Sequence, residues 1–154
     1  MAIQLVAGFL ISVIAILVHA LATVAVISAA RAMARGKAWR PRLHLMGVMV
    51  ATVLVLMLAH TLEVVTWSLA YAMVGAAPVG SDMLYFAFVN YTTLGYGDVT
   101  PVKAWQLLGP MAAMNGILMF GWSTAVLFEV LLKAIEHLGA IAAPGTPFSA
   151  EGRG

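Results

Sequence analysis

Three apolar stretches, each long enough to cross a lipid bilayer, constrain this chain of 154 residues more than any other feature. They run over about residues 3–30, 43–74 and 105–138. A helix that spans the hydrocarbon core needs about 20 predominantly apolar residues. Hydrophobic residues make up 63% of the chain and charged residues only 9%, which is not typical of a soluble domain. The sequence therefore predicts an all-α integral membrane protein with three transmembrane helices.

A shorter segment, residues 81–92, lies between the second and third stretches and cannot span a bilayer. Ser81 or Asp82 can cap the start of a helix there, because each side chain can accept from free backbone amides. Backbone that is not helical is tolerated at membrane depth only where protein or a water-filled cavity surrounds it. The pattern predicts a re-entrant helix over residues 81–92, followed by a loop that lines such a cavity.

The loop after this short helix carries the run Thr92-Thr93-Leu94-Gly95-Tyr96-Gly97-Asp98. A dehydrated cation needs oxygen ligands in place of its water shell, and rings of backbone carbonyls can provide them. Carbonyls point at a common axis only in a backbone conformation that Gly95 and Gly97 permit and most residues resist. This run therefore predicts an ion selectivity filter over residues 93–98.

Residues 85–101 resemble the pore helix and selectivity filter of bacterial potassium channels, with Leu94 where that family commonly has valine. The resemblance implies a homotetramer, K+ as the permeant ion and negative charge from Asp98 at the outer mouth. It places Tyr96 behind the filter and the Thr93 hydroxyl at its inner end. The expected K+ ligands are the backbone carbonyls of four successive residues: Thr93, Leu94, Gly95 and Tyr96. Gly97 completes the ion-binding segment.

Residues 115–125 resemble the inner helix of the same channels, with Gly116 at the position of a hinge glycine. Gly121 is a second weak point, and both glycines are compatible either with bending or with close helix packing. The resemblance directs three side chains into the cavity: Ile117, Phe120 and Thr124. Phe128 follows at i+4 and is a candidate hydrophobic gate, although packing between helices, or Leu132 as the gate, remains an alternative.

Glu63 is a carboxylate inside a predicted membrane helix, where a charge is costly and is usually buried in the bundle. His60 lies on the same helical face at i−3. In some relatives a carboxyl on the pore helix braces the filter, but this chain has Val89 there, so Glu63 is expected to support it against Asn90 or Tyr91. A structural hydrogen bond and a pH-sensing role for His60 are both open. The other histidines are expected to lie in helix packing or at the interface: His19, His44 and His137.

Five basic residues without an acidic neighbour fall between the first two apolar stretches: Arg31, Arg35, Lys37, Arg40 and Arg42. The positive-inside rule makes this loop cytoplasmic. The N-terminus is then outside the cell, the filter opens outward and the C-terminus is cytoplasmic, in the cell (inner) membrane. An aromatic belt is expected near the outer and inner boundaries: Trp67, Tyr71 and Trp105 outside, Trp39 inside.

The predicted organisation has three parts. Residues 1–42 form an extra N-terminal transmembrane helix with its basic loop, residues 43–138 form the pore domain with an inner helix over 105–138, and residues 139–154 form a disordered tail. With no cysteine and four scattered histidines, neither a catalytic triad nor a metal site can be argued, so an enzyme and a cofactor are not expected. A nucleic-acid partner is not expected either, because the basic residues lie in a short loop between membrane spans. Two alternatives remain: a weakly selective cation channel, and a non-conducting scaffold that binds a partner.

Overall fold

The computed structural model describes residues 1–34 and 41–142 and contains four α-helices and one 3₁₀ turn, with no strand among those residues. Three helices are long: α1 (Ala2–Ala34), α2 (Pro41–Val74) and α4 (Leu108–Ala142). The short helix α3 (Met83–Tyr91) and the 3₁₀ turn η1 (Lys103–Trp105) lie between α2 and α4. Each long helix is long and apolar enough to cross a membrane. The prediction of an all-α protein with three spanning helices is confirmed.

The helix boundaries follow local chemistry. Asp82, not Ser81, caps α3, because its carboxylate accepts from the backbone N–H groups of Leu84 (2.9 Å) and Tyr85 (3.1 Å). α4 begins three residues later than predicted, since Lys103–Trp105 form the 3₁₀ turn before it. It continues to Ala142, four residues into the segment expected to be a tail. Residues 143–154 and three of the predicted loop cations lie outside the described residues: Arg35, Lys37 and Arg40.

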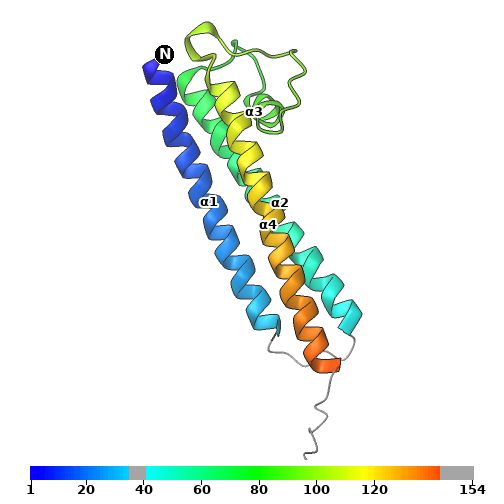
Figure 1. The fold of residues 1–154 in the computed structure, drawn as a ribbon. Coiled ribbons are helices and arrows are strands. Elements are labelled where there is room, and N and C mark those ends of the chain that lie inside the picture. The colour runs from blue at the N-terminus through cyan, green and yellow to red at the C-terminus, as the bar shows by residue number, and fades with distance from the viewer. Residues whose placement is uncertain (35–40, 143–154) are drawn as a thin grey trace, which may run out of the picture.

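The three long helices pack side by side, and α3 lies at one end of this bundle against α2 and α4 (Figure 1). α1 contacts α2 and α4 along the bundle. The start of α1 lies at the same end as α3, whereas the end of α1 and the start of α2 lie at the other end (Figure 1). The short helix and the loops around it therefore gather at the end opposite the α1–α2 connection.

Aromatic side chains form the core beneath α3. Trp67 and Tyr71 of α2 are fully buried, with the Tyr71 ring 5.0 Å from that of Phe86 in α3. Trp67 Nε1 donates to Asn115 Oδ1 (3.3 Å), and the Tyr71 hydroxyl donates to the carbonyl of Leu108 (3.2 Å). The expectation that Trp67 and Tyr71 lie in an interfacial belt is therefore wrong, because α3 and α4 cover them.

Trp105, the third residue expected in the outer belt, is half-buried, and Trp39 lies outside the described residues. A second apolar cluster holds the opposite end of the bundle together, where α1, α2 and α4 meet: Val26, Val48, Leu56, Val126 and Val130. The two clusters fix α1 against the remaining helices over most of its length.

Candidate functional site

The loop of interest begins where α3 ends, and two backbone hydrogen bonds close the helix. The N–H of Thr93 donates to the carbonyl of Asn90 (3.0 Å), and the N–H of Leu94 donates to that of Val89 (3.0 Å). With Thr92 as the C-cap, these are the two bonds of a Schellman motif, which puts the residue after the cap in the left-handed region. That residue is Thr93, at φ 61°, where glycine is usual.

The left-handed conformation then recurs at every second residue of the loop. Gly95 has φ 57° and Gly97 has φ 80°, whereas Leu94 and Tyr96 do not have positive φ. Thr93 is the only residue other than glycine with positive φ in the described ranges. For a β-branched residue this conformation costs about 1–2 kcal/mol. Such strain is typical of functional backbone.

The far end of the loop is also tied to α3. The Tyr85 hydroxyl donates to Asp98 Oδ2 at 2.7 Å, from the first turn of the helix that Asp82 caps. The hydrogen bond to the Asp98 carboxylate raises the pKa of Tyr85 above its ordinary value of 10.0, because it stabilises the protonated phenol. Both ends of residues 93–98 are therefore held by the same short helix.

Gly116 allows the end of α3 to lie directly on α4. A Cβ built at Gly116 would overlap the carbonyl oxygen of Tyr91 and lie 3.0 Å from its carbonyl carbon. At Gly109, the second residue of α4, an added Cβ would lie 3.0 Å from Asn90 Oδ1. No atom lies within 4 Å of a Cβ at Gly121. Of the two interpretations of these glycines, close packing is therefore supported at Gly116 by the contact with Tyr91. At Gly121 no contact within the chain supports it.

The predicted cavity and gate residues lie on an exposed face of α4. The exposed fractions of Ile117 and Phe128 are 60% and 62%, and Thr124 is also exposed. Phe120 is partly covered, since its ring lies 4.7 Å from that of His60 and 5.7 Å from that of Tyr91. In a single chain the other three side chains of this face are exposed. Its role as a cavity wall stays a prediction.

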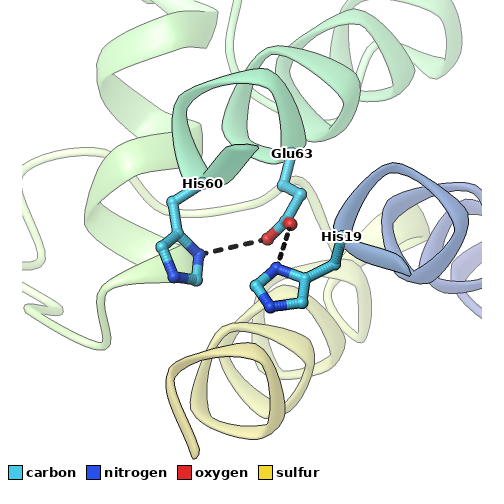
Figure 2. A group of neighbouring side chains, drawn as sticks. All are labelled: His19, His60 and Glu63. Atoms are coloured by element: carbon cyan, nitrogen blue, oxygen red, sulfur yellow. Dashed lines mark hydrogen bonds and ion pairs between the residues drawn. The ribbon is translucent and has the colours of Figure 1, made fainter. Parts of the chain in front are cut away.

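Glu63 is fully buried at the centre of a polar cluster that joins all four helices. His19 Nδ1 lies 2.8 Å from one carboxylate oxygen and His60 Nδ1 3.2 Å from the other (Figure 2). The Tyr91 hydroxyl donates to the same oxygen as His60. Of the two partners expected for Glu63, the structure brings Tyr91 into contact, whereas the amide nitrogen of Asn90 donates to the carbonyl of Phe86 (2.9 Å).

Sequence reasoning missed the contribution of the first helix to this cluster. The prediction that His19 is a histidine of helix packing is confirmed, but its partner Glu63, 44 residues away, was not predicted. Ser123 of α4 completes the group, with Oγ 2.8 Å from His60 Nε2 and 3.4 Å from His19 Nε2. The available signal was that polar residues inside membrane helices face the bundle and pair with one another.

Three apolar helices of spanning length, with a short capped helix packed against α2 and α4 at one end, define a helical membrane protein. A protein-family model described as an ion channel matches residues 44–133, more than half of the chain. The chain therefore belongs to this ion channel family and is a multi-pass membrane protein. The match is consistent with the predicted potassium-channel resemblance and runs from α2 into α4, so α1 lies outside it. Searches among curated proteins and among solved structures gave no match.

Proposed function

We propose that the protein is the pore-forming subunit of a potassium-selective channel, through which K+ passes passively down its electrochemical gradient. The observation that carries the proposal is the alternation of φ from Thr93 to Gly97. In an ordinary strand successive carbonyls point to opposite sides, whereas alternating right- and left-handed residues turn them to one side. The carbonyls of residues 93–96 can then replace the water shell of the ion.

The working unit is a homotetramer with cyclic symmetry. Residues 93–98 are exposed in the single chain, and a ring of carbonyls around a central ion needs several copies of that segment. Leu94 and Tyr96 have exposed fractions of 55% and 67%, so their side chains are free to pack against a neighbouring subunit. The exposed face of α4 that carries Ile117, Phe120 and Thr124 would line the cavity below the filter.

The depth and orientation of the subunit follow from helix length and charge. α3 has nine residues and is roughly 14 Å long, about half of a bilayer core, which supports a re-entrant helix. Its C-terminal end, which carries partial negative charge, leads directly into the filter and favours a cation there. Arg31 lies in the last turn of α1 and Arg42 in the first turn of α2, and these two helix ends lie at the bundle end opposite α3 (Figure 1). With that end cytoplasmic, the filter and the N-terminus face outward across the cell (inner) membrane.

Residues 43–138 would be the conducting unit and residues 1–42 an added helix. We place the support of the filter in the contact between Glu63 and Tyr91, since Tyr91 is the last residue of α3 and directly precedes Thr92 and Thr93. His60 contributes through its bonds to both of these side chains. Asn90 contributes at the α3–α4 contact, beside Gly109.

Potassium uptake into liposomes that hold the purified protein tests the proposal, with sodium under the same gradient as comparison. We expect uptake of K+ that barium blocks, and no uptake of Na+. Gly95→Ala should abolish the uptake of K+. Gly75→Ala is the matched control, because Gly75 has a similar φ of 64° against 57° but lies outside the filter. Loss of uptake in Gly95→Ala alone separates a filter effect from general backbone strain.

Two results would contradict the proposal in different ways. Equal uptake of K+ and Na+ would indicate a weakly selective cation channel. No uptake of either ion, by the wild type and by Phe128→Ala, would indicate a non-conducting scaffold.

A further inference from the structure

The cluster around Glu63 has the composition of a metal site. One ligand atom each from His19, His60 and Glu63 lies within 4.8 Å of the others. Both Nδ1 atoms face the carboxylate, from α1 on one side and from α2 on the other (Figure 2). Ion permeation through the filter makes no use of His19, and the family match does not include it.

The hydrogen-bond capacity of Ser123 limits where the protons of the two imidazoles can be. Ser123 Oγ has one hydrogen and two lone pairs and lies near the Nε2 atoms of both His19 and His60. If both neutral rings carried their proton on Nδ1, each Nε2 would need a donor, and Ser123 could serve only one. If both carry it on Nε2, Ser123 accepts from both at once. Two Nδ1 lone pairs then face the carboxylate of Glu63, an arrangement that a metal cation between them would stabilise and that, without a metal, a proton on one Nδ1 relieves.

We propose that this cation is a divalent transition metal of the zinc class, bound by His19 Nδ1, His60 Nδ1 and the carboxylate of Glu63. Two imidazoles and one carboxylate are a ligand set of known zinc sites. Zinc bonds of 2.0–2.1 Å at the tetrahedral angle separate ligand atoms by roughly 3.3 Å. The nitrogen–oxygen distances of 2.8 and 3.2 Å are hydrogen-bond distances and are shorter than this, so the side chains would have to move apart to hold the ion.

Two further residues of the cluster would support the bound metal. Ser123 would accept the Nε2–H of both histidines, which is the outer-shell role that orients metal-bound imidazoles. The Tyr91 hydroxyl donates to Glu63 and lies 3.1 Å from His60 Nδ1, so it would orient the carboxylate, and a water would take the fourth position. The metal would thus join α1, α2 and the end of α3 at one point.

His60 provides the entry to the site. The side chains of His19 and Glu63 are fully buried, whereas that of His60 is 15% exposed. An ion arriving beside Phe120, whose ring lies next to His60, meets His60 first and the buried ligands afterwards. A metal bound here would clamp the added helix α1 to the segment that leads into the filter.

Equilibrium dialysis of the purified full chain against zinc, with bound metal measured by mass spectrometry, tests the site without any measurement of flux. The affinity tag must contain no histidine. We expect one zinc per chain for the wild type and loss of that zinc in His19→Gln at the same free concentration. His44→Gln is the matched control, because His44 lies near the opposite end of α2. It should bind as the wild type does.

Two further measurements keep the test decisive if His19→Gln folds poorly. Ser123→Ala leaves every proposed ligand in place and should weaken zinc binding about 10–100-fold. Cobalt bound to the wild type should give the intense visible bands of four-coordinate geometry. No zinc bound by the wild type, equal binding by His19→Gln and wild type, or the weak bands of six-coordinate cobalt would each overturn the proposal. In the first case a shared proton, not a metal, lies between the rings and Glu63.

Discussion

The carbonyl oxygen of Tyr91 lies so close to Gly116 that no side chain fits between the end of α3 and α4. Gly116→Ala therefore forces the two helices apart at the residue that precedes the filter segment. Overpacking of this kind typically costs about 1–3 kcal/mol, because neither backbone can yield as a flexible side chain would. We expect a loss of that size in the free energy of unfolding, measured by denaturant titration in detergent micelles with circular dichroism as the probe.

Gly121→Ala is the control for this change, since it adds the same methyl group to the same helix with no atom of the chain within 4 Å. It should leave stability unchanged or raise it by up to about 1 kcal/mol, because alanine is the better helix former. Equal stability of the two variants would show that the contact between Tyr91 and Gly116 is looser than the structure has it.

Thr93 provides a second prediction, because it takes the left-handed position that closes α3 in place of glycine. Thr93→Gly relieves backbone strain of about 1 kcal/mol but removes the hydroxyl that we place at the inner end of the proposed filter. We expect this variant to unfold at higher denaturant concentration and to lose discrimination between K+ and Na+ in the liposome assay.

Thr93→Ser keeps the hydroxyl and the left-handed strain, so it should retain selectivity without the gain in stability. A Thr93→Gly variant that is less stable than the wild type would contradict the helix-closing role of this residue. One that keeps full selectivity would contradict the role of the hydroxyl.

The parts of the structure that sequence predicted are those that local chemistry decides. Hydropathy and length determine the three long helices, and Asp82 has the side chain that a helix start requires. The partnership of Glu63 with Tyr91 was one of two alternatives, and the choice between Tyr91 and Asn90 depends on how α3 is rotated against α2. A helix rotation has no local signal in the chain.

The parts that sequence did not predict depend on contacts between distant segments. Trp67 and Tyr71 have the composition of an interfacial belt, and only the presence of α3 over them makes them core residues. His19 has an ordinary apolar neighbourhood in its own helix, so its contact with Glu63 follows from the packing of α1 against α2. The hinge and packing interpretations of Gly116 could not be separated without the position of the Tyr91 carbonyl.

The bond between Tyr85 and Asp98 predicts a defined pH dependence at the Asp98 end of the proposed filter. The Tyr85 hydroxyl donates only while it is protonated, and this bond raises its pKa above 10.0. The contribution of the bond is therefore complete below the ordinary pKa and is lost as pH rises through the raised value. Tyr85→Phe should lower K+ over Na+ selectivity at neutral pH, and the difference from wild type should disappear above the raised pKa.

The ratio of K+ to Na+ uptake, measured for the wild type and Tyr85→Phe from neutral pH to above the raised pKa, shows whether the difference between them falls as pH rises. Phe88→Leu is a suitable control in the same helix, since Phe88 has no hydroxyl and does not reach Asp98 through a hydrogen bond. A difference between wild type and Tyr85→Phe that is already lost well below pH 10 would show that another group controls this end of the filter.

Phe128 tests the position of the gate. Its side chain is 62% exposed on the face of α4 that also carries Thr124 one turn earlier, and four such rings around an axis can exclude water from a narrow pore. Phe128→Ala removes the rings and should raise the basal uptake of K+ several-fold, because the closed state loses its apolar constriction. The ratio of K+ to Na+ uptake should not change, since the proposed filter lies near the start of α4 and Phe128 lies 20 residues further along it. Leu132→Ala, one turn further along, is the competing variant: if it raises uptake while Phe128→Ala does not, the constriction lies at Leu132.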